Sequence, residues 1–513
     1  MEHSVLSLII FIPIVGMAAV LCIPGQAHDL IKKVALAFTL PPFVLGIWLF
    51  QHFNRATPDL QFVVHDRWIE SYNIYYFVGV DGISISMVLL TVFLCPICIL
   101  ASWGIERAVK GYFALFLLLD AAMVGVFCAM DFFLFYVFWE LMLLPMYFLI
   151  GIWGGPRREY AAIKFFLYTM LGSVLMLIAM LVFYFQTDFS FDLTKLATTA
   201  KHFSTDPVLF GLNMPQLLWI GLFINFAVKI PAFPFHTWLP DAHVEAPTAI
   251  SVILAGVLLK MGTYGILRIN YPLLPEATFQ LAPYFLGALG AWNIVYGALC
   301  ALAQCFIEPK DMKKLVAYSS ISHMGYVMLG MASFTPQGIN GAVLQMFNHG
   351  TITAMLFLIV GVIYDRAHHR RIDGFGGLAS VMPVYTGVMA LAFFAAMGLP
   401  GLSAFISEVL VLLGAWQRYK IPTLFGAATV ILTAGYLLWT IQQMFLGQPR
   451  EDYAHMHLSE INARELWTLV PIGVVVLILG VYPHAVLDLL NVSLLNLNKI
   501  VLAAAQGTAV ALH

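Results

Sequence analysis

Charged residues are scarce in this sequence. Of its 513 residues only 10% are Asp, Glu, Lys or Arg, whereas a soluble globular domain carries about 25%. Hydrophobic residues make up 61%, and apolar stretches of about 20 residues, each long enough to cross a ~30 Å hydrocarbon core, recur along the chain. This balance excludes a soluble globular domain and predicts an all-α polytopic membrane protein in a lipid bilayer, with no nucleic-acid partner.

Metal-binding and nucleotide-binding patterns are also missing. The six cysteines lie in or beside apolar segments, and none of their spacings is typical of zinc or iron–sulfur sites. No Gly-x-Gly-x-x-Gly pattern follows a strand. Cys95-Pro96-Ile97-Cys98 has the spacing of a redox pair, but it lies inside a predicted membrane helix, where small apolar packing residues are the simpler interpretation. We therefore expect no cofactor and no metal in this chain.

Hydropathy predicts about fourteen membrane spans. The first apolar run lacks the positive residues that precede a cleavable signal sequence, so it is expected to be a permanent helix. The tail beyond Tyr482-Pro483 is expected to form a short terminal helix on the surface. The predicted spans lie near residues 4–22, 31–50, 81–101, 112–130, 132–152, 161–183, 208–230, 246–267, 278–302, 312–333, 337–364, 380–417, 421–447 and 464–489.

Basic residues are distributed unevenly between the loops. Loops after odd-numbered spans hold fifteen of the 25 Lys and Arg residues, and loops after even-numbered spans hold seven. By the positive-inside rule, the loops after odd-numbered spans face the cytoplasm. We therefore expect a multi-pass protein of the bacterial inner membrane with both termini on the periplasmic side.

Two proline breaks interrupt the predicted spans. Lys229-Ile230-Pro231-Ala232-Phe233-Pro234 ends the seventh span, and Gly398-Leu399-Pro400-Gly401 lies within the twelfth. The breaks are five spans apart, an odd number, so blocks built around them would run in opposite directions, as inverted-topology repeats do. An ordinary proline kink in each helix is the alternative. A charged residue beside each break favours an ion site.

Isolated titratable residues lie within the apolar spans. A charge at the bilayer centre costs at least ~2.5–3.5 kcal/mol on insertion scales. Two Glu and two Lys residues could form two ion pairs that only fix helix register, but buried pairs stabilise poorly compared with apolar packing. A role in proton transfer is therefore the favoured interpretation, with Asp120 as a weaker candidate and Asp131 as a helix cap. The candidate residues are Glu140, Lys229, Lys260, His323, His349 and Glu408.

Lysine suits proton transfer for a physical reason. The reference pKa of a lysine, ~10.4, is too high for release near neutrality, but burial can lower a lysine pKa to ~5–6. A carboxylate that moves closer raises it again. This pattern predicts Glu140 as modulator, Lys229 as carrier and His323 as relay between the two halves.

Other histidine patterns rank lower. His236 and His243 flank Trp238-Leu239-Pro240-Asp241, which is expected to be a re-entrant loop at the first break. His323 and His349 could in principle hold a haem between two helices. His455-Met456-His457 lies in a polar loop and is expected to be solvated.

Several motifs resemble one known family. The stretches Phe235 to His243, Glu245 to Ala249 and Ala317 to Gly325 resemble the antiporter-like membrane subunits of proton-pumping NADH:quinone oxidoreductase (respiratory complex I) and of multisubunit sodium/proton antiporters. Gly398-Leu399-Pro400-Gly401 followed by Glu408 resembles chain M, the chain 4 type, because related chains carry a lysine at the matching place.

The resemblance implies fourteen helices, two inverted five-helix repeats, and pump roles for all six candidate residues. It divides the chain into N-terminal membrane helices (1–111), two repeats that each form a proton half-channel (112–267 and 278–447), and a C-terminal helix and tail (448–513). The chain would be a non-redox subunit of a proton-translocating enzyme, with antiporter-like chains on either side and with NADH and quinone bound by other subunits. An antiporter subunit without redox partners and a structural membrane anchor are the alternatives.

Two segments depart from the family pattern. Cys305-Phe306-Ile307-Glu308-Pro309-Lys310 intervenes where the family usually runs directly from Ala-Gln into an Asp-x-Lys segment. Gln442-Gln443 stands where a basic residue is common. The sequence therefore does not predict how these two segments contact partner chains, and neither segment contains a candidate residue.

Overall fold

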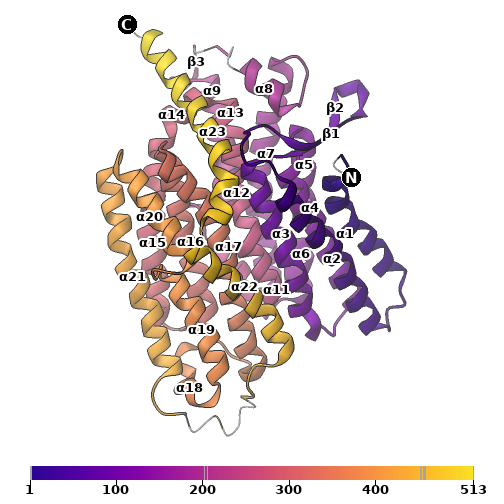
Figure 1. The fold of residues 1–513 in the computed structure, drawn as a ribbon, viewed down its shortest axis with the longest axis vertical. Coiled ribbons are helices and arrows are strands. Elements are labelled where there is room, and N and C mark those ends of the chain that lie inside the picture. The colour runs from indigo at the N-terminus through magenta and orange to yellow at the C-terminus, as the bar shows by residue number, and fades with distance from the viewer. Residues whose placement is uncertain (1–2, 201–202, 205, 451–452, 454–457, 512–513) are drawn as a thin grey trace.

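A computed structural model shows a bundle of long helices with two small β-hairpins at one end (Figure 1). It describes residues 3–200, 203–204, 206–450, 453 and 458–511, so His455-Met456-His457 lie outside the described residues. We call the end with both hairpins and α8 the hairpin face, and the opposite end the α18 face. The strands are β1 (Gln61–Ile69), β2 (Ile74–Val80), β3 (Pro207–Leu209) and β4 (Leu212–Asn213).

Each of the fourteen predicted spans has a helical counterpart. The counterparts are α1 (Val5–Cys22), α2 (His28–His52), α3 (Gly82–Ala101), α4 (Val109–Cys128), α5 with α6 (Phe132–Leu141, Leu143–Trp153), α7 (Arg158–Gln186), α9 with α10 (Met214–Lys229, Trp238–Glu245), α11 to α13 (Thr248–Ile253, Leu259–Gly265, Tyr271–Leu273), α14 with α15 (Pro275–Ala282, Leu289–Phe306), α16 (Met312–Ala332), α17 (Pro336–Ala367), α19 with α20 (Pro383–Ala396, Ser403–Trp416), α21 (Lys420–Phe445) and α22 (Ala463–Val481). The short helices α8 (Leu193–Thr199) and α18 (Leu378–Val381) lie outside the spans. The all-helical membrane fold expected from hydropathy is therefore confirmed.

Two predicted boundaries and the predicted length of the tail helix were wrong. Residues 208–213 belong to the β3–β4 hairpin, because Phe210 and Gly211 adopt positive φ and turn the chain before α9. The last predicted span ends at Val481 rather than at 489, since Pro483 cannot continue the hydrogen-bond ladder. The tail is no short helix: α23 (His484–Ala511) has 28 residues and packs against α3, α14 and α17.

Side-chain caps explain where the buried helices begin. Asp131 accepts from the N–H of Leu134 at the start of α5, as expected for a helix cap. Asp311 accepts from the N–H groups of Lys313 and Lys314 at the start of α16. Such caps satisfy N–H groups that have no partner within the helix, which matters most where lipid rather than water surrounds the chain.

Two spans are enclosed completely by the others. These are α17 and the span from Thr248 to Leu273, and the most apolar stretch of each is entirely buried. The second of them contains two π-helical segments, Leu254–Leu258 and Ile266–Asn270, on either side of α12. Such π-turns occur frequently at functional sites, and Lys260 lies between them.

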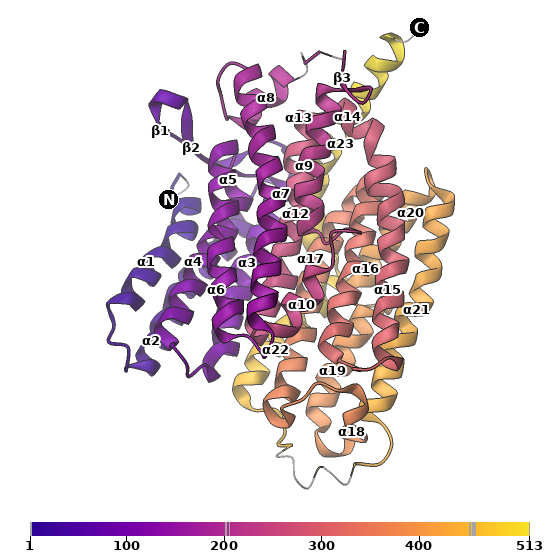
Figure 2. The same ribbon diagram turned by 180° about the vertical axis from the view of Figure 1, so that it is seen from behind.

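The two broken helices run in opposite directions. The pair α9–α10 begins at the hairpin face and ends toward the α18 face, whereas α19–α20 begins beside α18 and runs the other way (Figure 2). This antiparallel arrangement is the geometry expected for blocks of inverted topology.

Candidate functional site

Polar side chains form hydrogen bonds with the backbone groups that the first break leaves without helical partners. Asn293 on α15 is fully buried; its Oδ1 accepts from the N–H of Phe233 at 2.9 Å and its amide donates to the carbonyl of Pro231 at 3.4 Å. The indole of Trp238 donates to the carbonyl of Val228 at 2.8 Å. Non-helical backbone at membrane depth is tolerated only where protein or water forms hydrogen bonds with its N–H and C=O groups. These contacts therefore stabilise the break within the bundle. Trp238 to Asp241 form the first turn of α10, so the re-entrant loop predicted there is wrong.

The second break depends on two glycines. Gly398 and Gly401 have φ values of 71° and 92°, a region that favours glycine. Asn348 on α17 donates to the carbonyl of Ser403 at 2.7 Å, where α20 begins. A buried asparagine from an adjacent helix therefore binds backbone at or beside each break.

Four of the six candidate residues form one continuous group. Nζ of Lys260 is 2.7 Å from Nδ1 of His349. The ring centroids of His349 and His323 are 5.5 Å apart, and Nδ1 of His323 donates to Oε1 of Glu408 at 3.0 Å. All four side chains are buried. The group extends from the span of Lys260 in the first predicted repeat across α17 and α16 to α20 in the second.

Further polar residues complete the group around Glu408. Gln345 donates from Nε2 to Oε1 of Glu408 at 3.2 Å, and its own Oε1 accepts from the hydroxyl of Ser407 at 2.5 Å. Sequence reasoning missed Gln345 because it carries no charge. Its position four residues before His349, on the same face of α17, was the available signal.

Lys229 and Glu140 lie apart from this group. The ammonium of Lys229 is 3.8 Å from Sδ of Met142 and 5.1 Å from the ring centre of Trp139. It is fully buried, and the carboxylate of Glu140 is near enough to act on it electrostatically without forming an ion pair within 4.0 Å. Glu140 itself is partly exposed at the outer surface of the bundle.

The geometry argues against two alternatives. Among the described residues, the candidate Glu and Lys residues form no Glu–Lys ion pair with one another: Lys260 contacts a histidine, and Glu408 contacts a histidine and a glutamine. The cavity between His323 and His349 has a volume of only about 10 Å³, which is far too small for a haem. The described residues also contain no group of three His, Cys, Asp or Glu side chains arranged for a metal ion.

A buried ion pair lies toward the hairpin face, away from the candidate residues. Arg268 donates from Nη2 to Oδ1 of Asp81 at 2.7 Å and from Nε to the hydroxyl of Tyr264 at 3.0 Å. Asp81 also caps α3. This pair ties the N-terminal helices to the span that carries Lys260.

A cavity of about 700 Å³ lies at the α18 face. Its walls include residues from the loops after predicted spans 3, 5, 7, 11 and 13, together with Lys313. Because these odd-numbered loops meet at one end, an even number of membrane crossings lies between any two of them, as the predicted spans require. Carboxylates and cations both line the cavity, so its walls suit water better than lipid chains. The charged lining residues are Glu106, Glu245, Lys313, Asp365, Arg370, Arg464 and Glu465.

Comparisons with known proteins agree with this geometry. Residues 129–434 match the model of the NADH:quinone oxidoreductase/Mrp antiporter transmembrane family, and residues 30–130 match the amino-terminal model of NADH-ubiquinone oxidoreductase chain 4. The chain is 45% identical to NADH-quinone oxidoreductase subunit M of Rhodobacter capsulatus, with 96% of each chain covered. It is 44% identical to NADH-ubiquinone oxidoreductase chain 4 of Arabidopsis thaliana, again with 96% of each covered.

A solved structure shares both the fold and part of the sequence. A chain of respiratory complex I from Thermus thermophilus superposes with a TM-score of 0.85 and 28% identity, covering 98% of this chain and all of the other. The chain therefore belongs to the subunit M (chain 4) family, the antiporter-like, proton-translocating membrane subunits of NADH:quinone oxidoreductase.

Proposed function

We propose that Glu140, Lys229, Lys260, His349, His323 and Glu408 carry protons through this chain, in two repeats that span residues 112–267 and 278–447. The observation that supports this assignment most strongly is the continuous group from Lys260 through His349 and His323 to Glu408. Each member can gain and lose a proton, and each is enclosed by apolar helices that exclude competing water.

The histidines suit a relay because each ring has two nitrogens. A proton from Lys260 enters His349 at Nδ1, and His349 releases a proton at Nε2. The Nε2 atoms of His349 and His323 are both buried without a hydrogen-bond partner among the described residues. The cavity of about 10 Å³ beside both rings approaches the space one water needs, so a single water would join the two rings. His323 then passes its Nδ1 proton to Glu408.

Lys229 and Glu140 form the other part of the path. A lysine surrounded by Met142, Trp139 and Phe165 has little to stabilise its charge except the nearby Glu140 carboxylate and the faces of the aromatic rings. A shift of Glu140 toward or away from Lys229 therefore changes how tightly Lys229 holds a proton. Among the described residues no cation forms an ion pair with Glu140, so its carboxylate is not fixed by such a pair.

The 700 Å³ cavity would supply water to this path from the α18 face. The loops after odd-numbered spans, which are rich in Lys and Arg, line it, so the positive-inside rule places the α18 face in the cytoplasm. Both termini then lie on the periplasmic side of a bacterial inner membrane. The described helices of the proposed C-terminal part, α22 and α23, both pack against α3 and α17.

The chain is one subunit of a multisubunit assembly, and we propose antiporter-like chains on both of its sides. Partial exposure of Glu140 at membrane depth supports a neighbouring chain on that side, because a partly exposed acidic residue is costly in lipid. NADH and quinone would be bound by other subunits, and this chain would hold no cofactor.

Proton uptake by vesicles that contain the whole enzyme tests the assignment. His349→Leu should remove the central relay and lower NADH-driven proton uptake per assembled enzyme by about 10²-fold, the usual contribution of a proton-transfer group. Met346→Leu, three residues earlier on α17 and equally buried, should leave uptake unchanged. Full uptake by the His349→Leu enzyme would overturn the assigned path. Uptake of sodium in place of protons would favour the antiporter alternative.

A further inference from the structure

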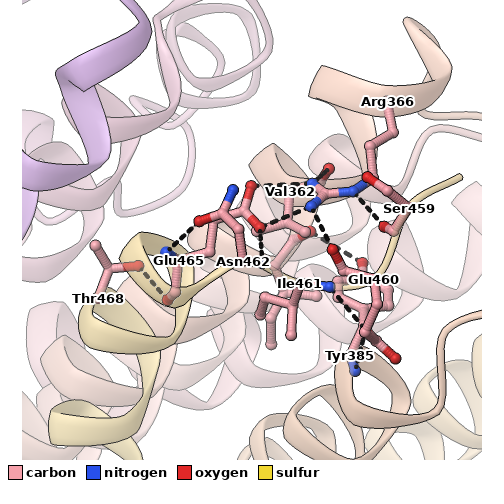
Figure 3. Close-up of polar contacts among 10 residues, drawn as sticks. Val362, Arg366, Tyr385, Ser459, Glu460, Ile461, Asn462, Glu465 and Thr468 are labelled. Atoms are coloured by element: carbon pink, nitrogen blue, oxygen red, sulfur yellow. Dashed lines mark hydrogen bonds and ion pairs between the residues drawn. The ribbon is translucent and has the colours of Figure 1, made fainter. Parts of the chain in front are cut away.

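Arg366, at the end of α17, has every N–H of its guanidinium bound. Nε donates to the carbonyl of Ser459 at 2.7 Å, and the two terminal nitrogens donate to the carbonyls of Val362 and Glu460 at 2.9 and 3.1 Å (Figure 3). The same nitrogens bind both carboxylate oxygens of Glu465, at 2.9 and 2.7 Å. A bidentate, buried pair of this kind fixes position as well as charge.

The acidic members of this cluster also fix the starts of two helices. Glu465 accepts from the N–H of Asn462 in the capping box of α22 (Figure 3). The carboxylate of Glu460 accepts from the N–H groups of Val384 and Tyr385 at 2.9 and 3.1 Å, in the first turn of α19. We call Arg366, Glu460, Asn462 and Glu465 the Arg366 hub. It ties the end of α17 to the starts of α19 and α22 at the α18 face.

The C-terminal end of α22 packs against the second break. A Cβ placed at Gly480 would overlap the carbonyl oxygen of Gly401 and would lie 2.5 Å from Cα of Leu402. Backbone therefore packs on backbone at this point, and only glycine fits. Fifteen residues separate Glu465 from Gly480, or ~22 Å along the helix axis at 1.5 Å per residue.

The helix that packs on the first break differs from α22 in its place in the chain. There Gly262, two residues after Lys260, packs on the backbone of α9: its Cβ would lie 2.7 Å from the carbonyl oxygen of Phe226 and 3.0 Å from the nitrogen of Ile230. The helix that seats the first break thus belongs to the first repeat and carries one of its proton-transfer residues. The helix that seats the second break, α22, lies outside both repeats.

We propose that α22 is a strut that sets the position of the second break relative to the α18 face, and thereby holds Glu408 against His323. The inference rests on the proton-transfer role proposed for Glu408. Gly480 and the Arg366–Glu465 pair act as positioning residues at the two ends of the strut. Glu408 lies in the second turn of α20, directly after the backbone that Gly480 supports, so a displaced break moves its carboxylate away from Nδ1 of His323.

Three substitutions in the complete enzyme test the strut. Gly480→Ala should displace the second break, because the added methyl group overlaps its backbone. Proton uptake per assembled enzyme should fall by about 10- to 100-fold, the loss expected for a displacement near 1 Å. Gly473→Ala is the matched control: it is a buried glycine on the same helix whose Cβ would meet only the side chains of Leu391 and Met355, at 3.1 and 3.5 Å. It should retain uptake within about twofold, since flexible side chains can give way. Glu408→Gln provides the reference for loss of the carboxyl group.

An infrared signature separates positioning from general damage. The carboxyl band that disappears in the Glu408→Gln enzyme should shift in the Gly480→Ala enzyme and stay unchanged in the Gly473→Ala enzyme. A fall in uptake with an unshifted band would overturn the strut. Normal uptake with Glu408→Gln would overturn the proposed role of Glu408 instead, whatever the glycine variants do.

If Gly480→Ala prevents assembly, a variant at the N-terminal end of α22 still tests the strut. Glu465→Gln keeps the size of the side chain but removes the charge that Arg366 holds. It should shift the same carboxyl band in the same direction and lower uptake less than Gly480→Ala. An unchanged band in assembled Glu465→Gln enzyme would contradict the strut.

Discussion

Lys260 and His349 share a hydrogen bond of 2.7 Å between the two spans that the rest of the bundle encloses completely. They are 89 residues apart in sequence. The span of Lys260 ends the first predicted repeat and α17 belongs to the second, so this bond is where the two halves of the proposed path meet. A titratable pair in the most enclosed part of a membrane protein is costly to keep, which favours a role in transport over one in stability.

Replacing Lys260 with Arg distinguishes a proton carrier from a fixed charge. Arginine keeps the positive charge but does not release a proton in proteins. We expect Lys260→Arg enzyme to assemble and to lose proton uptake by about 10²-fold or more. Uptake and assembled enzyme are measured in the same vesicles, with Met261→Leu as the neighbouring buried control. Wild-type uptake by the arginine variant would mean that position 260 supplies only a charge.

Replacing Glu140 with Gln tests the modulator of Lys229. Glutamine has nearly the same shape but cannot carry the charge that stabilises the Lys229 ammonium. We expect NADH-driven proton uptake to fall at least about tenfold with assembly intact, because one group that tunes proton transfer has been removed. Glu70→Gln, on the exposed hairpin, should leave uptake unchanged. Full uptake with Glu140→Gln would favour the structural anchor over the proposed mechanism.

Sequence reasoning found the titratable residues but not their partners. A lone charge in an apolar span is visible in the sequence because lipid excludes charge. Which partner it meets depends on how each helix is rotated and packed, and that is a property of the whole bundle. Glu–Lys pairs were the structural alternative that the sequence left open. In the structure, Lys260 instead meets His349, and Glu408 meets His323 and Gln345.

The fold followed from the sequence more fully than the site did. Apolar length and the distribution of basic residues sufficed for fourteen spans and their order. The exceptions have local causes. Hydropathy windows overlook a hairpin such as β1–β2, whose turn at Asn73 adopts a positive φ. They also underestimate α23, in which Asn491 binds Asn340 on α17 and Asn498 binds the carbonyl of Phe334 between α16 and α17.

The Asp81–Arg268 pair offers a test of stability that is separate from transport. Arg268→Met should leave the Asp81 carboxylate buried without its cation and destabilise the chain by about 3–5 kcal/mol. Asp81→Asn combined with Arg268→Met should recover much of this loss, since asparagine still caps α3 and no charge remains buried. The melting temperature of the purified enzyme reports both variants. An unchanged melting temperature in the single variant would show that the pair contributes nothing.

Asn293 offers a graded test of the first break. Asn293→Leu would leave the N–H of Phe233 and the carbonyl of Pro231 without their partner, and a buried unpaired group costs about 1–3 kcal/mol. Asn293→Asp, neutral when buried, keeps an acceptor for Phe233 and has one O–H in place of the two amide N–H donors, so its melting temperature should fall between those of the leucine variant and the wild type. Ile294→Leu, the adjacent buried residue, is the control for packing. If the break is held by Asn293, proton uptake per assembled enzyme should fall in the same order, because Lys229 lies immediately before the break. Equal stability of the leucine and aspartate variants would mean that the Phe233 bond does not hold the break, and that packing around Pro231 holds it instead.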